Sequence, residues 1–357
     1  MNPIIILSRD HLAEVVEQHL QMYGPTCDLN HLDISRVTSL DGIFYKSQFN
    51  GDISRWDTSN VCSLKNTFER SKFNGDISNW NTSNVQSMDT CFSQSAFNGD
   101  ISRWDTSKVA DMVYLFSGTR FQGDISKWNT SKVEYMNNLF SDSRFNGDIS
   151  GWDTSHVIGM TNMFSGSRFN GDISQWNTSN VRSMFRMFSG SRFEGDISQW
   201  DVSNVISMEY MFENAWFQGD LSTWDVSNVK SMQRIFYRDP KYGCEAPPYR
   251  GELPWSLHPD CDVRSAFSEY HPSILGIAAA LTRHFSQTPF PELHESTILG
   301  QRFKEARAVA EVLNTTLVQA AQFIYQQLSA LRSESSLLYH PKGLSEDIPD
   351  MSLQGIF

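Results

Sequence analysis

The middle of this chain repeats one line of sequence at a fixed interval. FNGDISRWDTSN begins at Phe49 and FNGDISNWNTSN begins at Phe73, 24 residues later. The heading phenylalanine then returns at the same spacing, at Phe97, Phe121, Phe145, Phe169, Phe193 and Phe217. A constant period of about 20 to 50 residues is typical of repeat proteins whose units stack because none of them buries its own apolar face. The interval therefore predicts a solenoid of stacked coils.

Within one repeat, the apolar spacing predicts two kinds of local structure. Val61, Leu64 and Phe68 are spaced i, i+3, i+7, which places them on one face of a short α-helix or 3₁₀-helix. Phe49 and Ile53 flank a Gly-Asp pair, which suits a short strand or an extended corner. We therefore expect each coil to contain a short strand, a bend and a short helix.

Aromatic residues recur in further columns at the repeat period. One column holds Phe44, Phe68, Phe92, Phe116, Phe140, Phe164, Phe188, Phe212 and Phe236, and another runs from Trp56 to Trp224. Such regular spacing is what core packing requires, so the columns predict a continuous aromatic core rather than a cofactor pocket. We expect the protein to hold no cofactor.

Two polar columns follow the same period. One alternates between Asp and Asn, beginning with Asp57 and Asn81, and together with Thr58 it stands where the predicted helix needs N-cap oxygens. The other stays acidic from Asp52 to Asp220, so we expect each carboxylate to accept local backbone N–H bonds or to meet a basic neighbour. A ladder of calcium sites is the alternative, although one carboxylate per repeat supplies few of the oxygen ligands that calcium needs.

The composition disfavours several classes of partner and site. The chain has 29 Lys and Arg against 41 Asp and Glu residues, which argues against a general attraction to nucleic acid or to an anionic membrane. Its five cysteines are odd in number and show no C-x-x-C spacing, so neither a disulfide framework nor a zinc site is indicated. No apolar run approaches the ~18 residues of a membrane span, and the first residues lack the apolar stretch of a signal peptide. We expect a protein without a metal site, and a cytoplasmic one if the chain is full length.

The array divides the chain into five segments. Residues 1–26 are expected to form a strand and helix cap, with an amphipathic helix over residues 10–22, and residues 27–240 to form about nine coils. Residues 241–271 hold a degenerate copy of the line, displaced by an insertion that carries Pro and Gly. Residues 272–333 carry helical periodicity and residues 334–357 form a tail. The helical segment is expected to cap the array, to mediate self-association or to bind a partner.

The whole line F-N-G-D-I-S-x-W-x-T-S-x-V-x-x-M-x-x-M-F resembles the BspA-like leucine-rich repeat family, in particular the branch found in mycoplasma surface lipoproteins. The similarity covers about residues 27–240. It implies a leucine-rich-repeat-like solenoid used for protein binding or adhesion, often at a microbial surface, and it brings no catalytic residues. The chain departs from that pattern because no lipoprotein signal cysteine stands near its start and because the helical C-terminal segment is not part of the repeat.

Four arginines form the first candidate binding site. Each precedes the heading phenylalanine of its repeat, so stacking predicts a line of cations about 5 Å apart. Like charges at that distance repel one another, so we expect either the aspartate columns or an acidic partner to neutralise them. The four residues are Arg120, Arg144, Arg168 and Arg192.

Three aromatic residues form the second candidate site. Tyr114, Phe185 and Tyr210 stand on the outer side of the predicted helices, at positions that are mostly polar in other repeats. Tyrosine is enriched at the energetic centres of protein interfaces, as aromatic residues are at interfaces in general. The alternative is that these rings pack against the terminal helices.

The leading interpretation is a non-enzymatic scaffold that binds another protein, with surface adhesion of a microbe as the alternative. No catalytic residue is assigned. An enzyme would have to use the C-terminal cluster His284, Glu292, His294, Glu295 and Glu305, which lacks H-E-x-x-H or a nucleophile motif. A further alternative is adsorption to ice or a polysaccharide through the column Thr58, Thr82, Thr106, Thr130, Thr154 and Thr178, where N-cap duty is the competing explanation.

Overall fold

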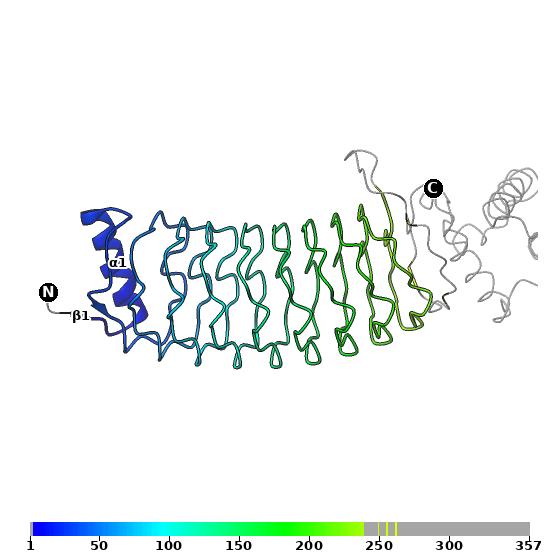
Figure 1. Cartoon of the computed structure of the whole chain (residues 1–357), viewed down its shortest axis with the longest axis horizontal. Coiled ribbons are helices and arrows are strands. Elements are labelled where there is room, and N and C mark those ends of the chain that lie inside the picture. Colours follow the sequence, from blue (N-terminus) through cyan, green and yellow to red (C-terminus); the bar gives the residue numbers. More distant parts are fainter. Residues whose placement is uncertain (1–2, 239–248, 250–254, 256–260, 263–357) are drawn as a thin grey trace, which may run out of the picture.

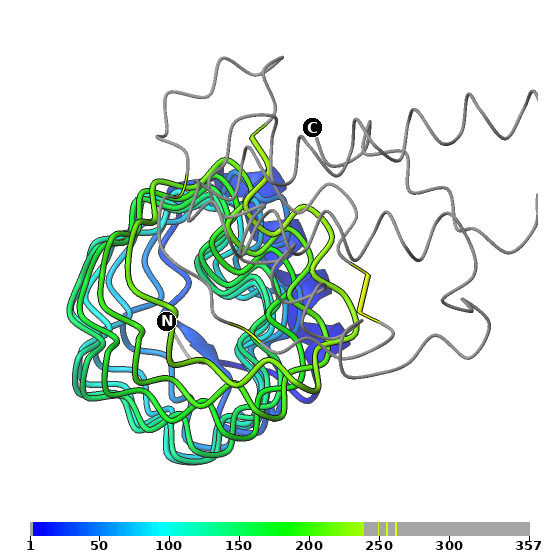
Figure 2. The same cartoon turned by 90° about the vertical axis from the view of Figure 1, so that its right-hand side faces the viewer.

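The computed structural model describes residues 3–238 together with residues 249, 255, 261 and 262. Its named elements all lie near the N-terminus and are β1 (Ile4–Ile5), α1 (Arg9–Tyr23) and β2 (Leu32–Asp33). Beyond them the chain winds into coils that stack along one axis (Figure 1). Viewed along that axis, successive coils superpose closely (Figure 2). The chain is a repeat protein.

The N-terminal cap closes one end of the stack. Helix α1 begins after Ser8, whose hydroxyl oxygen accepts a hydrogen bond from the backbone N–H of His11 at 3.2 Å. It ends at Gly24, where φ is 81° and the N–H donates to the carbonyl of Leu20. The helix expected over residues 10–22 is therefore present. Strand β1 pairs in parallel with β2, with Ile4 opposite Leu32, so the cap is joined to the first coil.

Each coil is joined to the next mainly through its backbone. From Leu64 onward, alternate residues donate their N–H to the neighbouring coil: Leu64 to the carbonyl of Ser87 at 3.0 Å and Phe68 to that of Cys91 at 2.9 Å. The residue preceding Phe68 closes a tight turn instead, with the Thr67 N–H donating to the carbonyl of Leu64. A buried backbone N–H or carbonyl group without a hydrogen-bond partner costs free energy. The alternation of bonds between coils and bonds within turns gives these groups partners.

The expectation of a helix in each coil is wrong, and the reason lies in the backbone angles. Asn66 and Arg70 have φ values of 54° and 56°, and equivalent positive angles recur in every repeat, whereas an α-helix needs φ near −63° throughout. The i, i+3, i+7 spacing arises here from successive tight turns. The short strand expected between Phe49 and Ile53 is also not formed, because in the described repeats strand pairing is limited to isolated bridges such as Asp28 with Asp52.

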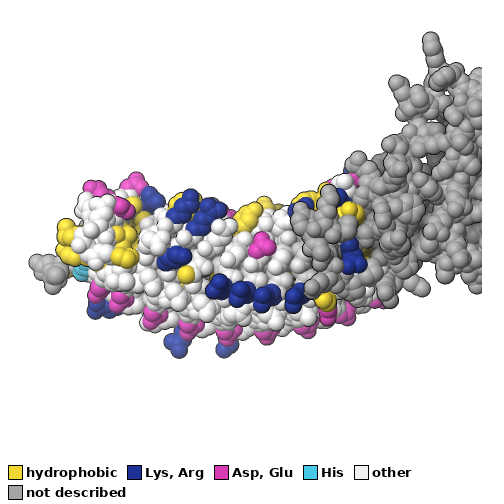
Figure 3. Space-filling model, turned by 90° about the horizontal axis from the view of Figure 1, so that it is seen from above, with side chains coloured by type: hydrophobic (Ala, Val, Ile, Leu, Met, Phe, Trp, Pro, Cys, Tyr) yellow, Lys and Arg dark blue, Asp and Glu magenta, His cyan; other side chains and the backbone are white. Residues whose placement is uncertain are grey.

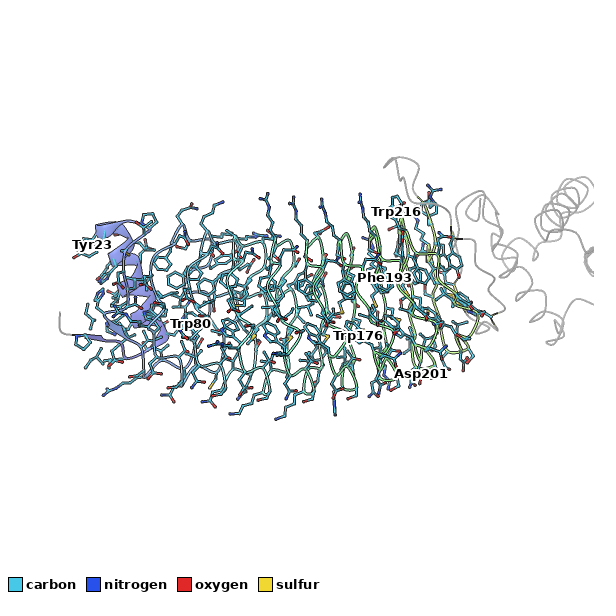
Figure 4. The ribbon with its side chains drawn as sticks, in the orientation of Figure 1. Tyr23, Trp80, Trp176, Phe193, Asp201 and Trp216 are labelled. Atoms are coloured by element: carbon cyan, nitrogen blue, oxygen red, sulfur yellow. The ribbon has the colours of Figure 1, made fainter. Side chains whose placement is uncertain are left out.

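The predicted aromatic core is confirmed. Within a coil, Phe68 packs on Phe73 with ring centroids 4.4 Å apart, and across coils it stacks on Phe92 at 5.6 Å with nearly parallel rings. The tryptophan column lies inside the stack as well, as Trp80 and Trp176 show in Figure 4. The Trp176 indole N–H donates to the carbonyl of Ile149 in the preceding coil at 3.2 Å, so the buried indole is satisfied.

The glycine of the repeated line is required by the phenylalanine two residues before it. A Cβ atom placed on Gly147 would lie 2.8 Å from two ring carbons of Phe145. Because the ring is buried and stacked between its neighbours, it has no room to move away. The spacing F-x-G in every repeat therefore follows from core packing.

Three described residues near the other end continue the columns of the repeat. Tyr249 stacks on Phe236 at 4.2 Å, and its hydroxyl donates to the carbonyl of Gly219 at 3.0 Å. Trp255 stacks on Trp224, and Asp262 pairs with Ser231. Residues 272–333 and 334–357, for which helices and a tail are expected, lie outside the described residues.

Replacing Gly190 with alanine should lower the free energy of unfolding by about 1 kcal/mol, because its φ of 65° is unfavourable for a residue with a Cβ. No steric clash contributes, since the nearest atom to the new Cβ is the Cα of Gly166 at 3.8 Å. Gly151 is the control, because its φ is not positive and its Cβ would meet no atom within 4 Å. Urea unfolding of both variants measures the difference, and equal midpoints would contradict this account.

Candidate functional site

The acidic column that begins at Asp52 stabilises turns. Each of its carboxylates accepts the backbone N–H two residues later, as Asp148 does from Ser150 and Asp172 from Ser174, both at 2.9 Å. The Ser150 N–H bond holds the pKa of Asp148 below its usual value. The expectation of local backbone bonds is therefore confirmed. Among the residues with a described placement, no group of three His, Cys, Asp or Glu side chains could hold a metal ion.

The alternating Asp and Asn column has the same role in a second turn. Asp57 and Asn81 each accept the N–H two residues later, at 3.0 and 3.1 Å. The turn that follows Asp57 is closed by the Val61 N–H donating to the carbonyl of Thr58. The residues do not cap a helix, so the N-cap expectation is wrong. An Asn serves as well as an Asp because only an acceptor oxygen is needed.

The threonine column is buried, which argues against the alternative of an adsorbing threonine surface. The six side chains Thr58, Thr82, Thr106, Thr130, Thr154 and Thr178 are 1–3% exposed. The Thr106 hydroxyl donates to the carbonyl of Asn129 in the next coil at 3.0 Å, and the other five make the equivalent bond. These hydroxyls join coils and offer nothing to ice or to a polysaccharide.

The four arginines of the first candidate site lie in a line on one side of the stack. We call Arg120, Arg144, Arg168 and Arg192 the arginine row. All four are exposed, while the phenylalanine that follows each of them is buried. Figure 3 shows basic side chains in a line along the stack, while many of the acidic side chains in view follow one edge. Backbone bonds between coils, such as Arg144 N–H to the carbonyl of Thr119 at 3.1 Å, hold the row in place.

The arginine row has no carboxylate partner among the residues that the structure describes. The ion pairs found there join other arginines, for example Arg55 to Asp28 and Arg234 to Glu213. The aspartates that were one of the two expected means of neutralising the row accept backbone N–H bonds in turns, and none of those described pairs with it. Asp201 and Trp216, which stands one coil beyond the row, lie at opposite sides of the stack in Figure 4. Of the two alternatives, pairing with the aspartate columns is therefore not observed in this part of the chain.

A line of side-chain amides runs beside the arginine row and was not singled out from the sequence. Asn98, Asn146 and Asn170 each follow a buried phenylalanine, so they face the same way as the residues that precede it. Their Oδ1 atoms accept the backbone N–H of the next coil, as in Asn170 N–H to Asn146 at 2.7 Å. No described protein atom accepts a hydrogen bond from their Nδ2 groups, which remain exposed donors. We call these residues the amide line.

Trp216 continues the arginine row by one coil and was also missed. Its backbone N–H donates to the carbonyl of Ser191, the bond that Arg168 makes to Ser143. The guanidinium of Arg192 lies over its ring at 5.8 Å from the centroid. The ring is half-buried, so the row ends on an accessible aromatic surface.

The three aromatic residues of the second candidate site do not form one surface. Phe185 and Tyr210 contact each other edge to face at 5.6 Å, and the guanidinium of Arg186 lies 4.6 Å from the Tyr210 ring centroid. Tyr114 is 41% exposed and stands several coils away without a ring contact among the described residues. Tyr114 and Tyr210 have φ values of 55° and 58°, so no helix face exists there.

Ion pairs of Glu213 with two arginines stabilise the cluster around Phe185 and Tyr210. Glu213 is buried, and its carboxylate lies 3.4 Å from Arg234 and 4.0 Å from Arg186. Burial raises the pKa of Glu213, while the two arginines act in the opposite direction. Because Arg186 and Arg234 form ion pairs with Glu213, this cluster has a structural role that accounts for its charges. The arginine row has no such described partner.

Replacing Asp105, Asp153 and Asp201 with asparagine should make the stability less sensitive to acid. Hydrogen bonds from the Ser155 hydroxyl and backbone N–H hold the pKa of Asp153 below its usual value, and Ser107 and Ser203 do the same for the other two. A lowered pKa stabilises the folded state above about pH 4, and the contribution is lost as the pH falls through the folded value.

The measurement is the urea midpoint at about pH 5 and about pH 3, where the asparagine variant should lose less than the wild type. Alanine at the same three positions is the control and should be less stable at both pH values, because the serine N–H groups lose their acceptor. An unchanged acid sensitivity in the asparagine variant would contradict the assigned role.

Replacing all four arginines of the row with glutamine should change the free energy of unfolding by less than about 1 kcal/mol, because no ion pair within the described residues is lost and mutual repulsion is relieved. The contact of Arg192 with the Trp216 ring is lost, but at 5.8 Å from the centroid it is a long one. Arg234→Gln is the contrasting variant. It removes an ion pair to Glu213 and a contact with the Tyr237 ring at 4.2 Å, and should cost about 1 kcal/mol by itself. Thermal and urea unfolding compare the two, and a larger loss in the row variant would show that the row is structural.

Comparison with known proteins gives a family without an assigned activity. A family model described as "Mycoplasma protein of unknown function, DUF285" matches three overlapping stretches, residues 14–122, 91–192 and 167–246. No curated protein and no solved structure matches the chain. In the described part of the chain, no helix has the length and apolar character of a membrane span. The three matches together cover more than half of the sequence, and the chain belongs to this mycoplasma repeat family of unknown function.

Proposed function

We propose that this protein is a non-enzymatic scaffold that binds another protein along one side of its stacked coils. The observation that carries the proposal is the arginine row, four exposed cations held at repeat spacing without a described carboxylate partner. Keeping like charges in line opposes folding slightly, so a stability role does not explain them. An acidic partner explains both the charge and the alignment.

The non-enzymatic part of the proposal is supported by the use of the polar side chains. The repeated Asp carboxylates, which could serve acid-base chemistry, accept hydrogen bonds in turns, and the repeated Thr hydroxyls, which could serve as nucleophiles, donate to neighbouring coils. Function follows from a site and not from a fold, and the described coils offer a binding surface. The cluster His284, Glu292, His294, Glu295 and Glu305, on which an enzymatic alternative depends, lies outside the described residues.

The finer relationship and the location are also proposals. The recurring F-N-G-D-I-S line supports a BspA-like, leucine-rich-repeat-like solenoid whose repeats have turns in place of strands and helices. The cysteine pattern supports a cytoplasmic location, since buried Cys91 is a core residue and the described cysteines are unpaired. Microbial surface adhesion is the alternative that the resemblance of the repeated line to BspA-like surface proteins suggests.

The scaffold proposal is tested by capture of a protein from lysate of the native source with the full chain as bait. Two further baits carry four substitutions each: the arginine row changed to glutamine, and Arg55, Arg103, Lys127 and Lys132 changed to glutamine as a control of equal charge on exposed positions elsewhere. We expect a protease-sensitive partner, bound saturably by the wild type and the control and at least about tenfold more weakly by the row variant. Failure of all three baits to retain any protein would contradict the scaffold.

A further inference from the structure

We propose that the arginine row binds an extended segment of the partner that carries acidic side chains at alternate positions. This inference rests on the proposed function and names the chemistry that the scaffold recognises. The row itself supplies the first argument. Each guanidinium offers paired N–H donors that match a carboxylate, and the described coils supply no carboxylate of their own to it.

The second argument is the repeat distance on this side of the stack. The phenylalanine rings next to the row stack at 6.2, 6.4 and 6.3 Å between centroids. Along the amide line, adjacent coils are joined by a hydrogen bond from a backbone N–H to a side-chain oxygen of the preceding coil. Such a bond spans a wider gap than the direct backbone bond between neighbouring strands, which are about 4.8 Å apart. Alternate side chains of an extended peptide lie about 6.6 Å apart, close enough for flexible arginines to follow. One acidic residue would therefore face each arginine.

The third argument is the amide line. Since the Oδ1 atoms of Asn146 and Asn170 are used between coils, this strip offers mainly N–H donors. An extended peptide presents backbone carbonyls as well as side chains, so its carbonyls would meet the amide line while its carboxylates meet the row. Gln122, which takes the place of asparagine beside Arg120, donates its Nε2 group to the carbonyl of Arg144, and Glu194 takes that place beside Arg192. Amide contacts would therefore be concentrated beside Arg144 and Arg168.

The fourth argument concerns the end of the row and the choice of polymer. Trp216 provides an accessible aromatic surface next to Arg192, which suits an apolar side chain that follows the last acidic residue. Single-stranded nucleic acid has phosphates at a similar spacing, but it is held by a series of aromatic rings on which bases stack. Within the described residues the row has such a ring at one end only, and the chain has a net charge of −12, which repels a dense polyanion.

The test is fluorescence anisotropy with the full chain and three labelled probes at near-physiological salt. The first probe is a peptide with four glutamates alternating with threonines and ending in leucine. The second has the same composition with its glutamates consecutive, and the third is oligothymidylate. The variants are Arg144→Gln with Arg168→Gln, and the control Arg103→Gln with Lys127→Gln, which removes two exposed charges of similar kind.

We expect the alternating peptide to bind the wild type and the control variant at least about tenfold more tightly than it binds the row variant. We also expect the wild type to bind the alternating peptide at least about tenfold more tightly than the consecutive peptide. Equal affinity for both peptides would overturn the proposal, because it would show attraction by charge alone. Tighter binding of oligothymidylate that depends on the row would overturn it in favour of a phosphodiester ligand. Absence of peptide binding, together with capture of a protein partner by the row variant bait, would overturn this inference and leave the scaffold function intact.

Discussion

The structure depends on one constraint, which is that every coil uses the next coil as the partner for its backbone. Alternate N–H groups from Leu64 to Arg70 all donate to carbonyls 23 residues further on, and the equivalent bonds recur in successive repeats. A residue inserted into one repeat would displace this set of bonds and the stacked rings together. The uninterrupted 24-residue interval follows from that double requirement, because hydrogen bonds and ring stacking must stay in the same register.

The sequence predicts the core well and the local backbone poorly, and both outcomes have a physical cause. Large apolar residues that recur at the same position of every repeat form one buried column, so the phenylalanine and tryptophan columns could be assigned to the core from their spacing. The same spacing could not decide whether each coil contains a helix. Helices and successive tight turns both return a side chain to the core after three or four residues, and only the positive φ of residues such as Asn66 distinguishes them.

The same limit explains what was found and missed at the candidate site. Arg144 and its equivalents could be selected from the sequence because a repeated charge has an evident energetic cost. The sequence predicts the local turn bonds of the aspartates, but it does not show that no described carboxylate pairs with the row. Asn146 resembles any turn asparagine until the structure shows that its Oδ1 is used and its Nδ2 is free to donate. Trp216 is hidden because it occupies a column where other repeats have arginine, lysine, glutamine or alanine.

The fixed spacing of a repeat array also limits which ligands its surface can bind selectively. Two unit charges about 6 Å apart in water repel by only about 0.7 kcal/mol, so four aligned arginines cost the fold little. Their alignment still has a consequence for binding, since a rigid row with a fixed step favours a ligand whose charges have the same step over one of equal charge and different spacing. The buried rings beneath the row set that step, because each arginine directly precedes a phenylalanine of the stacked core. The packing that stabilises the coils would then also be the source of specificity at their surface.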